Sequence, residues 1–290
     1  MLMDGPMSPA ARKVAFFFPG NSFPAVSVTG AICELQCDYC QGRHLRAMVP
    51  ISTPEGLLGL AKELQDRHAR GFLLSGGCDK VGRVPLLPFV PAIREIKRTT
   101  SLAVNLHTGL LDKEEARAIV SSQADCYSVD VHGDETTIRE MLHLPFDGDA
   151  YDSTLDALEL AGAKRIVPHV IIGLSGPDGD NEKKAVRIVA RHEADALILL
   201  MHVPTHGTPL ADTAAPSDAL VLEVVSLAVA SMDGPVLLGC MRGRGDHELE
   251  KECIRLGVAG MAMPSRKTVE WASAEGYEVK VEKACCALHL

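Results

Sequence analysis

Segments rich in β-forming residues alternate with helix-like segments from one end of the chain to the other. The strand-like segments are residues 25–29, 71–74, 102–106, 126–131, 165–172, 196–201, 236–241 and 257–261. The helix-like segments are residues 53–69, 88–97, 112–120, 152–161, 181–191, 217–230, 247–256 and 265–274. Eight such units predict an α/β fold, and we expect a complete (β/α)8 barrel of the TIM type. A doubly wound open sheet has the same alternation, so the alternation alone leaves both folds open.

Polar residues at the ends of the predicted strands favour the barrel. Side chains or glycines suited to binding or chemistry follow most of the strands: Cys33, Ser75, Gly76, Gly77, Cys78, Asn105, His107, Asp130, His132, His169, Gly173, His202, His206, Cys240 and Arg242. Barrel enzymes build their sites at the mouth where the carboxyl ends of all strands meet. Closure of the barrel would gather these residues around one central site.

The size and charge of the chain restrict its class. The 290 residues, 47% of them hydrophobic, can bury one large core. We expect a single domain over residues 1–290, with an N-terminal arm at 1–23 and a cysteine-containing tail at 277–290. The only apolar run near the start is residues 15–18, so we expect no signal peptide, no membrane span and a cytoplasmic location. The net charge of -9 argues against a nucleic-acid partner.

Nine cysteines in a chain without an export signal indicate metal binding or catalysis rather than disulfides. Cys33, Cys37 and Cys40 have a C-x3-C-x2-C spacing. Three thiolates are one fewer than a [4Fe–4S] cluster normally takes, so one iron would remain open for another ligand. The alternative is a structural zinc site of the Cys3His type, because His44 follows Cys40 at a suitable spacing.

This motif, with Tyr39 directly before its last cysteine, resembles the signature of the radical S-adenosylmethionine (SAM) superfamily. The resemblance implies that Cys33, Cys37 and Cys40 hold a [4Fe–4S] cluster whose open iron binds SAM, which then yields a 5′-deoxyadenosyl radical. No catalytic residues beyond the cluster and SAM are then required. Other stretches resemble SAM-binding segments of the family and imply contacts with SAM from Tyr39, Ser75, Gly76, Gly77, Asp130, His132, Ile171 and Gly173. Cys78 departs from the family pattern, which often has an acidic residue there.

Two further segments resemble biotin synthase: residues 206–212, and Arg242, which stands where that enzyme has an arginine ligand to a second, sulfur-supplying cluster. The cysteines that hold the second cluster of biotin synthase have no counterpart here, since the matching positions are Leu73, a residue near Val104, and Val167. We therefore predict a probable second iron–sulfur cluster of another origin, with the tail folded into the barrel so that its ligands are Cys78, Cys240, Cys285 and Cys286. The alternative is that these four are ordinary buried or free thiols.

A barrel of this size with a terminal cysteine pair resembles a subunit of the split, two-protein lipoyl synthases. The resemblance implies insertion of sulfur into an octanoyl chain on a lipoyl carrier protein or domain. It also implies a sister radical SAM subunit and an electron donor such as ferredoxin or flavodoxin as partners.

Two other functions stay open. One is a single-cluster radical SAM lyase or mutase acting on a small substrate in cofactor assembly, for which Asn105, His107 and His202 would bind the substrate. The other is a non-enzymatic iron–sulfur or zinc protein that binds no SAM.

Overall fold

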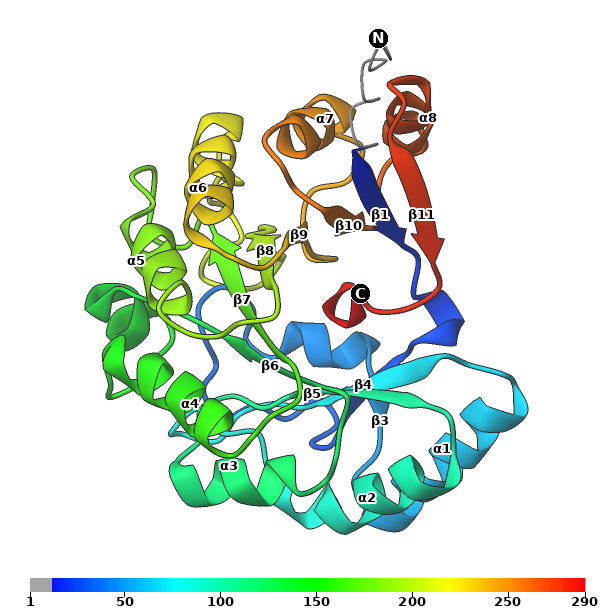
Figure 1. The fold of residues 1–290 in the computed structure, drawn as a ribbon. Coiled ribbons are helices and arrows are strands. Elements are labelled where there is room, and N and C mark those ends of the chain that lie inside the picture. The colour runs from blue at the N-terminus through cyan, green and yellow to red at the C-terminus, as the bar shows by residue number, and fades with distance from the viewer. Residues whose placement is uncertain (1–11, 290) are drawn as a thin grey trace, which may run out of the picture.

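The computed structural model describes residues 12–289, which form one curved sheet with helices on its outer face (Figure 1). The sheet has the order β11-β1-β10-β9-β8-β7-β6-β5-β4-β2-β3, and all its neighbouring strands are parallel. The strands are β1 (Lys13–Phe17), β2 (Ala25–Ser27), β3 (Val49–Pro50), β4 (Gly71–Ser75), β5 (Ala103–His107), β6 (Cys126–Asp130), β7 (Ile166–Ile172), β8 (Leu197–Met201), β9 (Val236–Leu238), β10 (Gly260–Ala262) and β11 (Glu278–Glu282).

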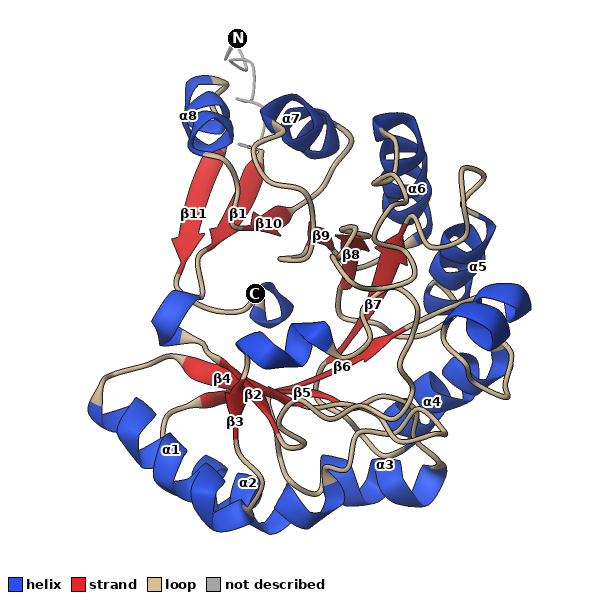
Figure 2. Ribbon diagram, turned by 180° about the vertical axis from the view of Figure 1, so that it is seen from behind, coloured by secondary structure: helices blue, strands red, loops and turns tan. Residues whose placement is uncertain are grey.

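Eight α-helices connect the strands and cover the outside of the sheet (Figure 2). They are α1 (Pro54–Asp66), α2 (Val90–Thr99), α3 (Lys113–Val120), α4 (Asp149–Leu160), α5 (Asp180–Val189), α6 (Asp218–Ser231), α7 (His247–Arg255) and α8 (Arg266–Ala274). Each corresponds to a helix-like segment of the sequence, and the eight strand-like segments correspond to β2 and β4 to β10. The α/β class is therefore confirmed. Within residues 12–289, no helix is long and apolar enough to cross a membrane.

The prediction of a complete eight-stranded barrel is wrong, because the sheet of the described residues remains open. A strand has two edges, and β1 uses both of them to pair with β10 and β11. In the same way, β2 pairs with β3 and β4. No edge of β1 or β2 is left to join these two consecutive strands, and the short turn Gly20–Ser22 passes between them.

The two strands that leave the sheet open lie in the segments expected to be an arm and a tail. β1 lies within residues 1–23, and β11 lies within residues 277–290. Their register, with Lys13 beside Glu278 and Phe17 beside Glu282, makes them an added pair at one end of the sheet. Four of the five residues of β1 are buried, whereas β11 has three exposed residues, two half-buried ones and none that is buried. This pattern is typical of an edge strand for β11 and an interior strand for β1.

The chain after β11 turns into the space enclosed by the sheet, and both ribbon views show this end near the middle of the molecule (Figures 1 and 2). A short helical turn, Cys286–Leu288, packs there in a small apolar core that is separate from the larger core beneath the outer helices. This inner core consists of Ala15, Phe17, Cys126, Val167, Ala196, Ile198, Leu237, Ala262, Cys286 and Ala287. The expectation that the tail folds into the barrel thus agrees with the structure.

Specific contacts hold the tail in place. The Cys126 thiol donates to the Ala287 carbonyl at 3.5 Å, and the Arg165 guanidinium donates to the His289 carbonyl at 2.6 Å. The His289 ring meets the Phe17 ring edge-on at 5.7 Å between centroids. Beside the tail, a cavity of about 580 Å³ lies between β11 and the start of β5. The tail therefore occupies part of the space that an open sheet would leave unfilled.

Replacing Ala287 by Asp is expected to release the tail without unfolding the sheet. Ala287 is 1% exposed among apolar side chains, and burying a charge there costs several kcal/mol unless the tail leaves. We expect alkylation of Cys285 and Cys286 in the cluster-free protein to become at least about 10-fold faster. Peptide mass spectrometry after timed labelling measures this rate. The control is Ala274→Asp at the exposed end of α8. An unchanged labelling rate in Ala287→Asp would show that this packing does not hold the tail.

Candidate active site

A cavity of about 480 Å³ opens at the carboxyl ends of the strands, next to the loops that follow β2, β4, β5, β6 and β9. Thirteen of the residues expected to bind clusters, SAM or substrate line it: Cys33, Cys37, Tyr39, Cys40, Ser75, Gly76, Gly77, Cys78, His107, Asp130, His132, Ile171 and Cys240. Its volume lies in the range of small-molecule and cofactor sites. The fold thus brings residues from across the chain to one site.

The loop with the three cysteines is held against the Gly76-Gly77 segment. Thr29 links them, because its hydroxyl donates to the Ile32 carbonyl at 2.8 Å and accepts from the Gly77 amide at 2.7 Å. A Cβ atom on Gly77 would lie 2.0 Å from the Ile32 carbonyl oxygen and 2.6 Å from the Cys33 Cα. Gly77 is therefore required by contact with the cysteine loop itself.

Cys37 and Cys40 shift each other's pKa. A hydrogen bond with Cys37 lowers the pKa of Cys40 to about 7, and the same bond together with burial raises the pKa of Cys37. Cys37 and Cys40 are 6% and 9% exposed, and Cys33 is partly exposed. Metals bind the thiolate form, so Cys40 is the thiol that is already prepared to bind.

The donors of the alternative zinc site are not gathered around one point in the structure. Four ligands around one zinc, with bonds of about 2.3 Å to sulfur, lie about 3.8 Å apart. Among the described residues, no three donor atoms of Cys33, Cys37, Cys40 and His44 come within 4.8 Å of one another. His44 instead lines the cavity with its ring 6.3 Å from that of Tyr39. Three thiols that face one cavity, without His44 beside them, are the ligand set expected for a cubane with one open iron.

Asp130 supplies a charged acceptor on the opposite wall. Its Oδ1 atom is buried and has no hydrogen-bond partner in the described part of the chain, although it lies 3.4 Å from His107 Nε2 and 3.8 Å from His169 Nδ1. Burial opposes ionisation, but the two histidines outweigh it and hold the pKa of Asp130 well below its usual range. An ionised carboxylate with a free acceptor fits the hydroxyl or ammonium groups of SAM.

The three polar groups around Asp130 have distinct charge states. Burial opposes protonation of His107, yet the Asp130 carboxylate raises its pKa. Burial and the charge of His107 lower the pKa of His169 to about 3. Burial also lowers the pKa of His132, whose ring packs edge-on against Tyr151 at 5.5 Å. Asp130 therefore favours protonation of His107 most strongly among the three rings, whereas burial keeps the pKa of His169 and of His132 low.

Sequence reasoning missed two residues at the start of α5 that shape the walls of the site. Asn181 accepts from the Gly133 and Asp134 amides after β6, at 2.9 and 3.1 Å. Glu182 accepts from the amides of residues 173–175 after β7. Both side chains are fully buried. Their sequence signal is a pair of polar residues that falls on the inward face of an amphipathic helix.

Six expected site residues lie outside the cavity lining, among them Gly173 and His202. Gly173 is the first amide bound by Glu182, and a Cβ there would meet the Pro216 ring at 2.9 Å, so it packs against the next loop. His202 is buried, and its Nε2 lies 3.2 Å from the Thr213 hydroxyl. These two residues support neighbouring loops in the structure.

The four cysteines expected at a second cluster fall into two groups. Cys285 and Cys286 are hydrogen-bonded neighbours in the tail. Burial raises the pKa of Cys240, and the charge of Cys285 raises it further. Asn105 Nδ2 lies 3.9 Å from the Cys285 sulfur. In contrast, the pKa of Cys78 is raised first by burial and then by Cys33, so its thiol neighbours belong to the SAM motif. The structure therefore separates Cys78 from the other three.

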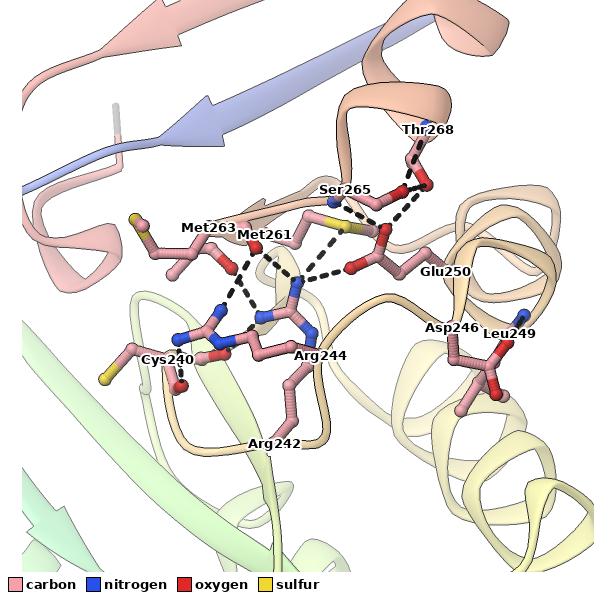
Figure 3. Close-up of polar contacts among 12 residues, drawn as sticks. Cys240, Arg242, Arg244, Asp246, Leu249, Glu250, Met261, Met263, Ser265 and Thr268 are labelled. Carbon is pink, nitrogen blue, oxygen red and sulfur yellow. Dashed lines mark hydrogen bonds and ion pairs between the residues drawn. The ribbon is translucent and has the colours of Figure 1, made fainter.

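Arg242 is bound within the protein rather than directed into the cavity (Figure 3). Its guanidinium forms a buried ion pair with Glu250 at 2.7 Å and donates to the Gly239 and Ala262 carbonyls. Glu250 also accepts from Ser265 and Thr268 at the start of α8. This network joins the loops after β9 and β10, and so fixes the segment that contains Cys240.

Arg244, which the sequence analysis did not consider, lies closer to Cys240. Its guanidinium donates to the Cys240 carbonyl at 2.8 Å and to the Met263 carbonyl at 3.0 Å (Figure 3). Its positive charge lowers the pKa of the Cys240 thiol, in opposition to burial. Arg244 is exposed, whereas Arg242 is 5% exposed.

Gly77→Ala is expected to displace the cysteine loop, because the added methyl group overlaps the backbone of residues 32 and 33. We expect a lower iron content after anaerobic reconstitution and at least about 10-fold slower formation of 5′-deoxyadenosine, since misplacing reacting groups by 1 Å can cost about 100-fold. The control is Gly59→Ala in α1, where a Cβ has nothing within 4 Å. Wild-type iron content and rate in Gly77→Ala would contradict the importance of this contact.

Arg242→Met is expected to reduce the free energy of unfolding by about 3–5 kcal/mol, because it leaves the Glu250 carboxylate buried without its partner. Arg244→Met serves as the exposed control, with an expected loss within about 1 kcal/mol. Urea unfolding of the two variants measures the difference. Equal losses would mean that the Arg242 ion pair does not stabilise these loops.

Comparison with known proteins agrees with this geometry. Residues 27–191 match the radical SAM superfamily. A biotin synthase from Syntrophotalea carbinolica is 27% identical over 245 residues, covering 81% of this chain and 73% of that protein. A biotin synthase from Geobacter metallireducens is 26% identical over 232 residues, covering 75% of this chain and 68% of that protein.

Solved structures show the same fold at lower identity. HydG, a maturase of the [FeFe]-hydrogenase, has a TM-score of 0.64 and 16% identity over 89% of this chain, which spans 58% of the HydG chain. Methylornithine synthase (PylB) has a TM-score of 0.62 and 14% identity, covering 92% of this chain and 83% of that one. At these identities the likeness concerns the fold alone. The matched segment extends over more than half of the chain and contains the three-cysteine motif, so the chain belongs to the radical SAM superfamily, with biotin synthases among its distant relatives.

Proposed function

We propose that the chain is a sulfur-inserting radical SAM enzyme, one subunit of a two-protein lipoyl synthase. The observation that carries the proposal is the position of the tail. It brings Cys285 and Cys286 into the interior of the sheet, where the charge of Cys285 acts on Cys240 at the cavity wall. Three thiols below the SAM-binding residues are what a second cluster next to the radical source requires.

The described residues fit both cofactors. Cys33, Cys37 and Cys40 would hold the first cluster, as family membership implies, and Cys240, Cys285 and Cys286 would hold the second. Neither group contains a disulfide. In the first group, the pKa of Cys40 is about 7. In the tail pair, a hydrogen bond from Cys286 lowers the pKa of Cys285 to about 7. Each group therefore has one thiol that readily becomes a ligand.

When bound, the first cluster and SAM supply a radical that removes hydrogen from an unactivated carbon, and the second cluster supplies the sulfur. The chain itself binds, orients and excludes water. Asp130 and the backbone at Gly76-Gly77 would position SAM, while His107 lines the same cavity and Asn105 contacts Cys285 of the tail. Each sulfur inserted exchanges one C–H bond of the substrate for a C–S bond.

The cavity lining supports an alkyl substrate. Many of the side chains that line the cavity are aliphatic: Leu73, Val84, Leu110, Leu142, Leu144, Ile171 and Leu200. Such a wall favours a hydrocarbon chain over a charged small molecule. We therefore propose an octanoyl chain on a lipoyl carrier protein or domain as the substrate. A sister radical SAM subunit and ferredoxin or flavodoxin are the proposed partners.

The double variant Cys285→Ala/Cys286→Ala tests the proposal. We expect it to contain about four irons per chain instead of about eight, because only the second cluster is lost. It should still cleave SAM under strong reductant, yet it should add no sulfur to an octanoylated carrier peptide in the presence of the sister subunit. Iron analysis, chromatography of 5′-deoxyadenosine and peptide mass measure these three quantities.

Two further variants make the test specific. Changing Cys33, Cys37 and Cys40 to Ala should abolish SAM cleavage and leave about four irons. Cys253→Ala, a thiol buried beneath α7 and away from the cavity, should resemble the wild type in both respects. A wild-type chain with only about four irons and no change in peptide mass would refute sulfur insertion and favour a single-cluster lyase or mutase.

A further inference from the structure

The second cluster belongs to the proposed function, on which this inference rests. Three thiols leave that cluster one ligand short of four. The remaining protein groups nearby are already engaged. Cys78 belongs with the SAM motif, and Arg242 is paired with Glu250. The Asn105 side-chain oxygen accepts from the Ser128 hydroxyl at 3.0 Å, which leaves its amide nitrogen facing Cys285. A fourth protein ligand would come from another residue at this level of the sheet.

His107 occupies that level. It follows Asn105 by two residues on β5, so both side chains point to the same face, about 7 Å apart along the strand. Asn105 contacts the Cys285 sulfur, and His107 shares a cavity with Cys240. A cluster that spans Cys285 and Cys240 therefore lies beside the His107 ring.

The two nitrogens of His107 differ in what they contact. Nε2 lies 3.4 Å from Asp130 Oδ1 and 3.4 Å from His169 Nδ1. Within residues 12–289, no hydrogen bond involves Nδ1 of His107. A metal-binding histidine usually donates its other N–H to a carboxylate, which fixes the ring and its tautomer. Asp130 is placed for this role, whereas His169 does not line the cavity.

We propose that His107 is the fourth ligand of the second cluster and binds its iron through Nδ1. On binding of the cluster, the Nε2–H group would donate to Asp130 Oδ1, which lies 3.4 Å away without a hydrogen bond, and this would select the tautomer whose Nδ1 lone pair is free. Ligation uses that lone pair alone, so no electron or proton is transferred to or from the cluster. Asp130 then touches both cofactor sites: Oδ1 orients the ligand of one, and the other carboxylate oxygen remains for SAM.

The test uses the full chain with Cys33, Cys37 and Cys40 changed to Ala, so that any cluster present is the second one. Protein is prepared with ordinary and with ¹⁵N-labelled histidine, reduced, and examined by pulsed EPR for nitrogen hyperfine coupling. We expect a strong coupling that changes with the label. It should disappear in His107→Cys, which keeps about four irons because a thiolate replaces the imidazole, and the midpoint potential should fall.

Matched variants identify the histidine. His169→Gln removes the other imidazole next to Asp130 Oδ1 and should leave the coupling in place. Asp130→Asn should weaken the coupling without removing iron. Retention of the histidine coupling in His107→Cys, or its loss in His169→Gln alone, would overturn the assignment. If the triple variant contains about four irons but shows no histidine coupling, only this inference fails. If it contains no iron, the proposed second cluster fails as well.

Discussion

Each strand has only two edges for pairing, and the rest of the structure follows from how β1 uses its own. Because β10 and β11 occupy both edges of β1, the sheet does not close onto β2, although the two strands are adjacent in sequence. An open sheet exposes apolar side chains of its concave face. The segment after β11 covers them with Cys286, Ala287 and the His289 ring. The pairing that prevents closure thus also delivers a cysteine pair to the interior.

The sequence predicted the repeating part of the fold well. All eight expected helices and eight expected strands are present, because long amphipathic helices and apolar parallel strands have strong periodic signals. Closure was predicted wrongly because β1 and β11 carry weak signals. β1 reads as a brief apolar run, and β11 alternates Glu, Val, Lys, Val and Glu at a half-exposed edge. Which edge each pairs with depends on long-range contacts that a single sequence does not reveal.

The candidate site divides in a similar way. The cysteine motif could be located from its spacing, and Gly77, Asp130 and His132 from their place at the ends of predicted strands and from the family resemblance; the structure gathers them around one cavity. Arg242 could not be interpreted correctly, since its partner Glu250 lies on the next helix and is buried only through the fold. Residues that act through backbone amides, such as Asn181 and Glu182, have no motif of their own. Their role depends on the loops after β6 and β7, whose backbone amides they bind.

Under the proposed function, the tail supplies ligands of the second cluster, so binding of that cluster is linked to packing of the tail. A metal site that forms only in the folded chain contributes its binding free energy to folding. Here the folded element would be the segment from Ala284 to His289, which rests on few contacts: a small inner core, one thiol donor at Cys126 and one guanidinium at Arg165. Cys240 and His107 are fixed independently, by the loop network after β9 and by strand β5. A cluster bound between a rigid wall and a lightly held tail stabilises the tail more than the wall. Loss of that cluster would accordingly loosen the tail first, because the sheet and its outer core do not depend on it.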